Sequence, residues 1–230
     1  MCGITGFWDT TCQTPERVLN RLAQKMSSAI LHRGPDDGGV WSHAGSGLAL
    51  GFRRLAIIDL TPTGHQPMLS PSGRYVMVYN GEVYNFAEMR VELENLGVKF
   101  RGTSDTEVML AAIEAWGLEK SVQRFNGMFA IALWDRQEKT LTLIRDRLGI
   151  KPLYYGWFGS TLLFGSELKA LRAHPAFRGE IDRNALTLYL RHNYVPAPHS
   201  IYQGINKLPP GSYLTLRAGE SSDDQKIMPY

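Results

Sequence analysis

The order in which strand and helix patterns follow one another is the feature that most restricts the fold of this chain of 230 residues. An apolar run at residues 3–8 predicts a first strand, and residues 15–31 carry apolar side chains at helical spacing. The later elements expected from the patterns are strands at 47–58 and 74–79, helices at 85–96 and 104–117, strands at 128–134, 140–145, 153–158 and 161–164, and short helices at 167–173 and 183–191. This order lacks the regular strand–helix alternation of a parallel sheet, so we expect an α+β fold of antiparallel sheets covered by helices.

Local signals mark the ends of the expected helices. Thr14 before Pro15 is typical of a helix N-cap followed by a proline in the first turn. Two further helix starts have capping-box spacing, Asn85 with Glu88 and Ser104 with Glu107, and Gly97 and Gly117 are expected to end these helices.

Composition excludes several classes of function. The net charge is only +3, and no run of five basic residues is present, so we expect no nucleic-acid partner. No apolar run approaches the roughly 18–20 residues of a membrane span, and no secretory signal is visible at the N-terminus. Two cysteines, Cys2 and Cys12, and six dispersed histidines make neither a disulfide framework nor a metal site. A cytoplasmic location is therefore expected.

Cys2 is the candidate nucleophile, because it directly follows Met1. Removal of Met1 would give Cys2 a free α-amine with a pKa of about 7.7–8.0, beside a thiol whose unperturbed pKa is about 8.5. One residue would then supply both nucleophile and base, as in N-terminal-nucleophile hydrolases. Taken alone, a cysteine at position 2 is equally compatible with an ordinary N-terminal tail.

The pair Asn80-Gly81 has two interpretations. Both residues tolerate positive φ, so the pair is typical of a hairpin or strand-to-loop turn. Alternatively, the Asn80 amide and the Gly81 backbone N–H could be aimed at one oxygen, as the donors of an oxyanion hole are.

Three charged residues could bind an amino acid. Arg54 lies in an apolar strand pattern. It is either a strand-edge arginine whose guanidinium lies in water, or a residue whose guanidinium binds a carboxylate in bidentate fashion. Asp105 either complements the dipole of the helix that begins at Ser104 or meets an ammonium group, and Glu82 has the same two interpretations. His32 and His65 are candidates for a Cys–His dyad, but each lies in a Gly/Pro-rich loop without an evident orienting partner.

The motifs together resemble one family. They occur at residues 1–4 (MCGI), 32–36 (HRGPD), 54–57 (RLAI), 80–85 (NGEVYN), 102–105 (GTSD) and 145–155 (RDRLGIKPLYY). Their identity and order resemble class II glutamine amidotransferases, and most closely the glutaminase half of the glutamine-hydrolysing asparagine synthetases. The resemblance covers about residues 1–215 and implies the four-layer αββα sandwich of N-terminal-nucleophile hydrolases.

The resemblance implies a role for each candidate. Cys2, after loss of Met1, resembles the nucleophile that attacks the side-chain amide of L-glutamine, and Asn80 with Gly81 resembles the oxyanion-hole pair. The substrate-binding positions implied are Arg54 for the α-carboxylate, Asp105 with help from Glu82 for the α-ammonium, and Ile57 at the end of the arginine motif. The motif at 32–36 is expected to shape a loop near the site, and 145–155 and 164–169 to be structural or to line an exit for ammonia.

The domain organisation follows from the same resemblance. We expect a glutaminase domain at 2–217 and the start of a linker at 218–230, leading to an ATP-pyrophosphatase-type synthetase domain. The Ser-Gly-Gly-x-Asp-Ser loop of such domains does not occur here, so ATP and Mg are expected only in that partner domain, and this chain is expected to need no cofactor. A homodimer is possible. Two alternatives stay open, namely ammonia supply to another carboxylate such as a sugar acid, and a non-catalytic assembly domain.

Overall fold

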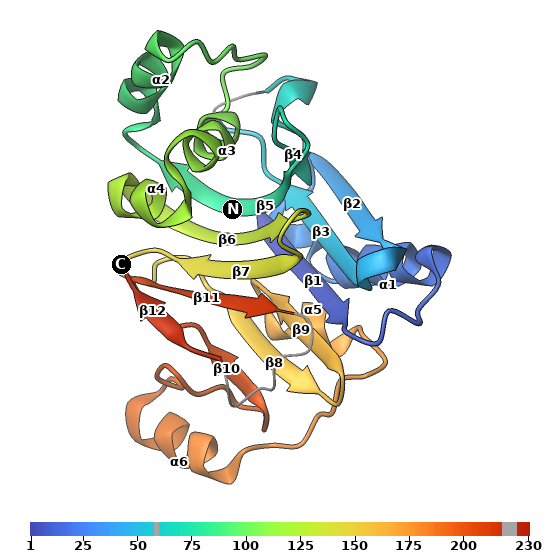
Figure 1. The fold of residues 1–230 in the computed structure, drawn as a ribbon. Coiled ribbons are helices and arrows are strands. Elements are labelled where there is room, and N and C mark those ends of the chain that lie inside the picture. Colours follow the sequence, from blue (N-terminus) through green and yellow to red (C-terminus); the bar gives the residue numbers. More distant parts are fainter. Residues whose placement is uncertain (58–59, 218–224) are drawn as a thin grey trace.

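Two antiparallel six-stranded sheets lie face to face in the computed structural model, which describes residues 1–57, 60–217 and 225–230 (Figure 1). The first sheet has the strand order β10 (Ile205–Lys207), β8 (Tyr154–Phe158), β9 (Thr161–Gly165), β1 (Gly3–Asp9), β3 (Leu48–Arg54) and β2 (Asp37–His43). The second sheet has the order β12 (Ile227–Pro229), β11 (Ser212–Arg217), β7 (Thr140–Arg145), β6 (Gly127–Asp135), β5 (Tyr75–Val83) and β4 (Met68–Leu69).

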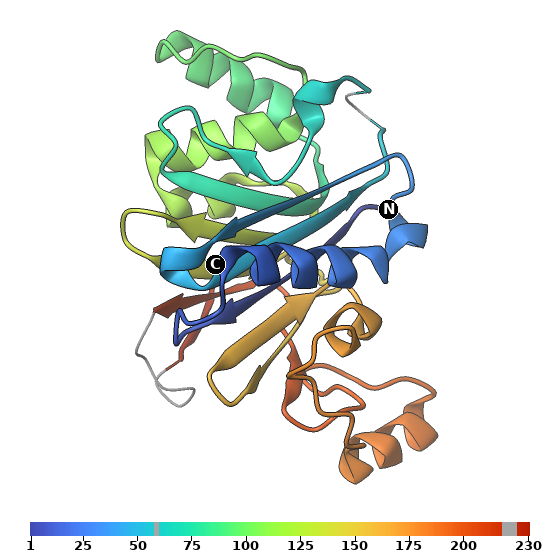
Figure 2. The ribbon, with the colours of Figure 1, turned by 90° about the vertical axis from the view of Figure 1, so that its right-hand side faces the viewer.

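Helices cover the outer face of each sheet. α1 (Glu16–Ser28) and α5 (Leu168–Arg172) cover the first sheet, and α2 (Phe86–Asn95), α3 (Asp105–Trp116) and α4 (Leu118–Arg124) cover the second. Figure 2 shows α1 running across strands of the first sheet, with α2–α4 on the far side of the second. α6 (Arg183–His192) stands apart at the edge near β10 in Figure 1. The layers are those of the αββα sandwich expected from the sequence.

Successive side chains of a strand point to opposite faces of the sheet, so one sheet contributes to two cores. In β6, Ala130, Ala132 and Trp134 face the core between the sheets, whereas Phe129 and Ile131 face the core beneath α2–α4. Because both faces are covered, most of these strand residues are buried and the strands read as continuous apolar runs.

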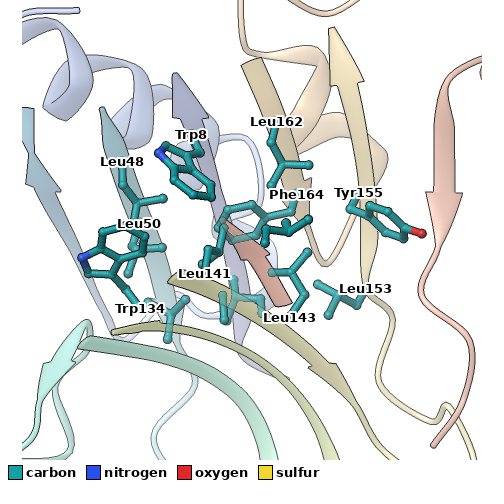
Figure 3. Packing of buried hydrophobic residues seen from close by; sticks show 14 of the residues in the cluster. Trp8, Leu48, Leu50, Trp134, Leu141, Leu143, Leu153, Tyr155, Leu162 and Phe164 are labelled. Carbon is teal, nitrogen blue, oxygen red and sulfur yellow. The ribbon is translucent and has the colours of Figure 1, made fainter. Parts of the chain in front are cut away.

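The core between the sheets is built around two tryptophans. Trp8 from β1 and Trp134 from β6 meet edge to face with ring centroids 5.4 Å apart, and leucines from both sheets surround them (Figure 3). This core fixes the two sheets against each other and so fixes the strand ends that carry the candidate site.

Three helix starts differ from the sequence expectation. Thr14 donates its hydroxyl hydrogen to Asp9 at 2.6 Å and does not cap α1. The Asn85 side chain binds the backbone of residues 124–126 and leaves α2 without a side-chain cap. Ser104 does cap α3, by accepting from the Thr106 N–H at 3.1 Å, but Glu107 accepts from residues 101 and 102. In each case a partner outside the helix competes with the local cap, and for Asn85 that partner is distant in the sequence.

Several elements were not expected from the sequence: β2, β4, α4, β10, β11 and β12, together with the short 3-10 turns Leu31–Arg33, Ala44–Ser46 and Pro62–Gly64. β12 falls in the stretch expected to begin a linker, where Ile227–Pro229 pairs with β11. Two ranges lie outside the described residues: 218–224, in the same stretch, and 58–59, at the end of the strand expected at 47–58. The strand found there, β3, ends at Arg54. The domain boundary at 217 stays a prediction. Across the described ranges, none of the helices has the length and apolar character needed to cross a membrane.

Candidate active site

One pocket of about 130 Å³ brings together every site residue predicted from the sequence. The predicted residues in its lining are Cys2, Arg54, Ile57, Asn80, Gly81, Glu82 and Asp105. The lining is completed by Met1, Leu55, Gly64, Gln66, Tyr79, Ser104, Thr106, Met128 and Lys151. The start of β1, the end of β3, the middle of β5 and the start of α3 therefore meet around the Cys2 side chain.

Cys2 is half-buried just before β1, and its sulfur lies against the backbone of Leu55. The Leu55 N–H donates to Sγ at 3.4 Å, and the thiol lies 3.5 Å from the Leu55 carbonyl oxygen, which can accept its hydrogen. Burial raises the pKa of the thiol, and this outweighs the Leu55 N–H and the positive charges of Arg54 and Lys151, which lower it. The resting side chain is therefore a thiol, and attack by the sulfur needs a base.

Arg33 holds the backbone of the candidate nucleophile. Its Nε donates to the Cys2 carbonyl oxygen at 2.9 Å, and its Nη1 donates to Glu167 at 3.0 Å. Burial alone would raise the pKa of the Glu167 carboxyl, but hydrogen bonds from Arg33, His32 and Lys169 outweigh burial and lower it to about 2. The expected loop at 32–36 thus lies beside the site, and the 164–169 segment supports it.

Neither candidate dyad histidine lines the pocket. His32 pairs with Glu167 at 2.9 Å, and His65 pairs with Asp37 at 2.7 Å. The geometry offers no Cys–His dyad in the described part of the chain.

Asn80 and Gly81 lie inside strand β5, so the turn interpretation of this pair is wrong. Asn80 is only 1% exposed, and neither polar atom of its amide has a hydrogen-bond partner within the described residues. A buried amide left unpaired costs free energy, so a ligand that accepts from it would recover that cost. A Cβ on Gly81 would lie 2.1 Å from the Met128 carbonyl oxygen, so the sheet permits only glycine there.

Arg54 ends β3 with its guanidinium buried, not with its head in water. Its Nη1 donates to the Thr61 carbonyl oxygen at 2.8 Å, and a Cβ built on Gly64 would lie 2.2 Å from Nη2. The residue is 8% exposed, yet it lines the pocket. Gly64 therefore leaves the space that the guanidinium occupies.

Asp105 is the first residue of α3 and is anchored to β5. Its Oδ2 accepts from the Tyr79 hydroxyl at 2.7 Å and from the Val83 N–H at 3.1 Å. Burial raises the pKa of the carboxyl, against the lowering effect of these hydrogen bonds. Desolvation also raises the pKa of Tyr79 well above its usual value, with Asp105 adding to the rise, so Tyr79 stays a hydrogen-bond donor.

Glu82 and Ile57 complete the predicted set. Glu82 follows Gly81 on β5 and is half-buried, which gives the pocket a second carboxylate. Ile57 is 59% exposed, so it lies at the rim. The pocket thus combines one thiol, one unpaired amide and charged groups of both signs.

Sequence reasoning gave no role to several residues of the lining, among them Gln66, Tyr79 and Lys151. Gln66 accepts from the Tyr79 N–H at 2.6 Å through Oε1 and lies 3.4 Å from the Thr106 hydroxyl through Nε2. Nothing around a lone glutamine before Pro67 indicates this position. Tyr79 directly precedes the motif at 80–85, and Lys151 lies in the motif at 145–155, so proximity to these motifs was the available signal.

Comparison with known proteins agrees with the geometry. A family model described as a glutamine amidotransferase domain matches residues 1–227. The glutamine-hydrolysing asparagine synthetases 3 and 1 of Bacillus subtilis (strain 168) are 39% and 38% identical over 219 residues, which is 94% of this chain in both cases. The chain spans about a third of the length of these relatives, 35% and 34% respectively.

Two solved structures share the fold. The glutamine phosphoribosylpyrophosphate amidotransferase of B. subtilis complexed with ADP and GMP matches 99% of this chain and 49% of its own, with a TM-score of 0.70 and 18% identity. A structure titled as the allosteric regulatory enzyme of purine biosynthesis matches 99% of this chain and 49% of its own, with a TM-score of 0.69 and 19% identity. The chain therefore belongs to the family of glutamine amidotransferase domains, as a class II member with the αββα fold of N-terminal-nucleophile hydrolases.

Proposed function

We propose that this chain is the glutaminase domain of a glutamine-hydrolysing asparagine synthetase, with Cys2 as its nucleophile. The observation that carries the proposal is the single pocket in which the Cys2 thiol, the unpaired Asn80 amide and the charged side chains of Arg54 and Asp105 meet. The asparagine synthetases of B. subtilis, which match 94% of the chain, support the same activity.

The charges of the pocket suit the main-chain groups of L-glutamine. The buried Arg54 guanidinium binds the α-carboxylate, since its planar donors match a carboxylate. Asp105, oriented by Tyr79 and Val83 and helped by Glu82, binds the α-ammonium. Ile57 covers the substrate at the rim. The side chain of glutamine then extends toward Cys2 and Asn80.

Removal of Met1 starts the reaction cycle. Met1 lines the pocket beside Cys2, so its loss opens space and creates the Cys2 α-amine. That amine, acting directly or through water, takes the thiol proton as Sγ forms a bond to the side-chain carbonyl carbon of glutamine. The carbonyl oxygen becomes an oxyanion, which the Asn80 amide and the Gly81 N–H stabilise.

Two bond cleavages complete the turnover. The carbon–nitrogen bond breaks while the protonated α-amine of Cys2 returns its proton to the leaving nitrogen. Ammonia departs, and a γ-glutamyl thioester remains on Cys2. Water then adds to the thioester, the carbon–sulfur bond breaks, and glutamate leaves as the thiol regains its proton. The domain itself uses no cofactor in this scheme.

The ammonia serves ATP-dependent amidation of aspartate in a partner synthetase domain, where ATP and Mg act. The length of the curated relatives, about three times that of this chain, supports a further domain in proteins of this kind. We place the protein in the cytoplasm, where Cys2 and Cys12 stay reduced, and a homodimer is compatible with the proposal. A non-catalytic assembly domain has no use for the buried unpaired Asn80 amide.

Hydrolysis of L-glutamine by the purified chain tests the proposal. We expect glutamate and ammonia in equal amounts, and no release of ammonia from L-asparagine, whose side chain is one methylene shorter and falls short of Cys2. A Cys12→Ser variant is the matched control, because Cys12 is exposed and does not line the pocket. Absence of glutamate release from a folded chain that has lost Met1 would contradict the proposed function.

A further inference from the structure

Lys151 is a buried charge that the proposed reaction does not yet use. It is 4% exposed and lines the pocket with Cys2 and Glu82. Through the described ranges, its hydrogen bonds involve only its backbone atoms, and its ammonium group forms no ion pair within 4.0 Å. The residue as a whole is largely buried, but its ammonium nitrogen keeps contact with the open space of the pocket, so its charge can act on the chemistry there.

The fold forces Lys151 into this position. Asp146, which is fully buried, accepts from the Lys151 N–H at 2.9 Å and from the Ile150 N–H at 2.9 Å. Arg145 donates from Nε to the Lys151 carbonyl oxygen at 2.8 Å. The backbone of Lys151 is thus held through both its N–H and its carbonyl oxygen.

Several charged groups from different elements lie in or beside the pocket of Cys2. They are the N-terminal amine, Arg33 at the Cys2 carbonyl oxygen, Arg54 at the end of β3, Glu82 on β5, Asp105 at the start of α3 and Lys151 on the loop after β7. Burial lowers the pKa of Lys151, and Arg33 adds to this effect, whereas Glu82 and Cys2 raise it. Burial raises the pKa of Cys2, against the lowering effects of the Leu55 N–H, the N-terminal amine, Arg54 and Lys151.

Glutamine binding changes which positive charge acts on the sulfur. In the proposed complex the substrate carboxylate neutralises Arg54, and the substrate ammonium engages Asp105 and Glu82. Lys151 then shares the pocket with the sulfur, and these carboxylates no longer compete for its charge. Charges set among buried side chains interact more strongly than in bulk water, so this ammonium acts when the thiol gives up its proton.

We propose that Lys151 is a positioning residue whose ammonium group stabilises the thiolate form of Cys2 during attack on glutamine. It acts through the sulfur and does not bind the substrate, so the inference rests on the proposed nucleophile. It assigns to the motif at 145–155 an electrostatic role, which differs from both roles expected from the sequence, a structural one and an exit for ammonia.

The pH dependence of Cys2 alkylation tests this role without glutamine. The parent is the Met1-processed chain with Cys12→Ser, so that Cys2 is its only thiol, and iodoacetamide labelling is followed by intact mass. We expect Lys151→Met to move the midpoint of the alkylation rate upward by about one pH unit, with a fall of about tenfold in the rate at neutral pH. Lys151→Arg should keep the parent midpoint, because it keeps the charge.

Further measurements separate this role from a structural one. Lys151→Gln is the second neutral variant should Lys151→Met fail to fold, and thermal unfolding checks both. In the neutral variants of Lys151 we expect kcat for glutamine to fall while KM stays near the parent value. A folded neutral variant with an unchanged alkylation midpoint, or one that changes only KM, would overturn the inference. If the parent lacked glutaminase activity while Lys151→Met still shifted the alkylation midpoint, the result would contradict the proposed function and not the effect of Lys151 on the thiol.

Discussion

The Tyr79 hydroxyl donates a hydrogen bond of 2.7 Å to Oδ2 of Asp105 and thereby ties strand β5 to the first turn of α3. Both residues are buried, and the same oxygen also accepts from the Val83 N–H. Tyr79 precedes Asn80 on the strand, so one short segment both carries the amide proposed for the oxyanion and orients the carboxylate proposed for the substrate ammonium.

Tyr79→Phe should weaken glutamine binding more than catalysis. The substitution keeps the ring but removes the donor that orients Asp105, so we expect KM for glutamine to rise about tenfold with a smaller change in kcat, a loss of about 1.4 kcal/mol. Steady-state kinetics measure both constants. Tyr84→Phe, at an exposed position just beyond β5, is the matched control and should leave KM unchanged. An unaltered KM in Tyr79→Phe would remove the orienting role.

Asn80→Ala should reduce kcat without reducing stability. An oxyanion donor contributes about 2.7–4 kcal/mol to the transition state, so kcat should fall about 10²–10³-fold. The Asn80 amide has no partner in the described structure, so the free energy of unfolding should not fall by the amount expected for a lost hydrogen bond.

Asn85→Ala is the contrasting variant for this prediction. Its side chain donates to the Arg124 carbonyl oxygen and accepts from the Asn126 N–H, each at 3.0 Å. We expect a loss of about 1 kcal/mol in the free energy of unfolding and an unchanged kcat. If Asn80→Ala behaved as Asn85→Ala does, Asn80 would be a structural residue.

Arg54→Lys should raise KM for glutamine strongly although it keeps the positive charge. An ammonium group cannot match a carboxylate with two parallel donors, and it cannot replace the hydrogen bond to Thr61 in the same geometry. We expect KM to rise about 10–100-fold, a loss of about 1.4–2.8 kcal/mol, with kcat changing less. The affinity for L-glutamate, the product with the same main-chain groups, measured by isothermal titration calorimetry, provides a second readout. Equal affinities in parent and variant would exclude Arg54 as the carboxylate site.

The stability of the domain should fall between neutral pH and pH 5 because of His174. Burial lowers the pKa of this histidine to about 4, and its Nε2 is buried without a partner among the residues that the structure describes. The unfolded chain takes up a proton near pH 6.5, whereas the folded chain does so only near pH 4. His174 therefore favours the folded state above pH 6.5, and its contribution is lost as the pH falls, by about 2 kcal/mol at pH 5.

Denaturant unfolding at pH 7 and at pH 5 measures this effect. Glu167, with its pKa lowered to about 2, loses its own stabilising contribution only at lower pH. Asp105, whose pKa burial raises, acts in the opposite direction as the pH falls, so a histidine variant is needed to separate the two. His174→Gln removes the titrating group and should flatten the dependence over this interval. A variant that loses as much stability as the parent would assign the dependence to other groups.

The sequence predicted which residues meet in the pocket better than it predicted the local contacts around them. Asn80, Gly81 and Glu82 are consecutive on one strand, and Cys2 is set by the chain start, so short motifs were sufficient for them. Lys151 is held by Asp146 within its own motif, from which no role for the lysine was predicted. Gln66 reaches the pocket through a loop, and its side chain bonds to Tyr79 and Thr106, which lie far along the chain. No local pattern indicates the position of Gln66.

The same reason explains the elements that were missed. β2 contains Gly38 and Gly39, which weaken a strand pattern, yet it pairs with β3 along its whole length. Gly39 also leaves space for Gln66, since a Cβ there would lie 2.2 Å from the Gln66 carbonyl oxygen. Neighbouring strands and loops, and not local propensity, determine these segments.

The most direct test is the mass of the chain quenched during glutamine turnover. After loss of Met1, we expect a fraction of the chain to gain the mass of one γ-glutamyl group, to carry it on the peptide that begins with Cys2, and to lose it on treatment with hydroxylamine. Cys2→Ala should show neither the adduct nor glutamate release. Glutamate release by Cys2→Ala at the parent rate, or an adduct on a chain that retains Met1, would contradict the account.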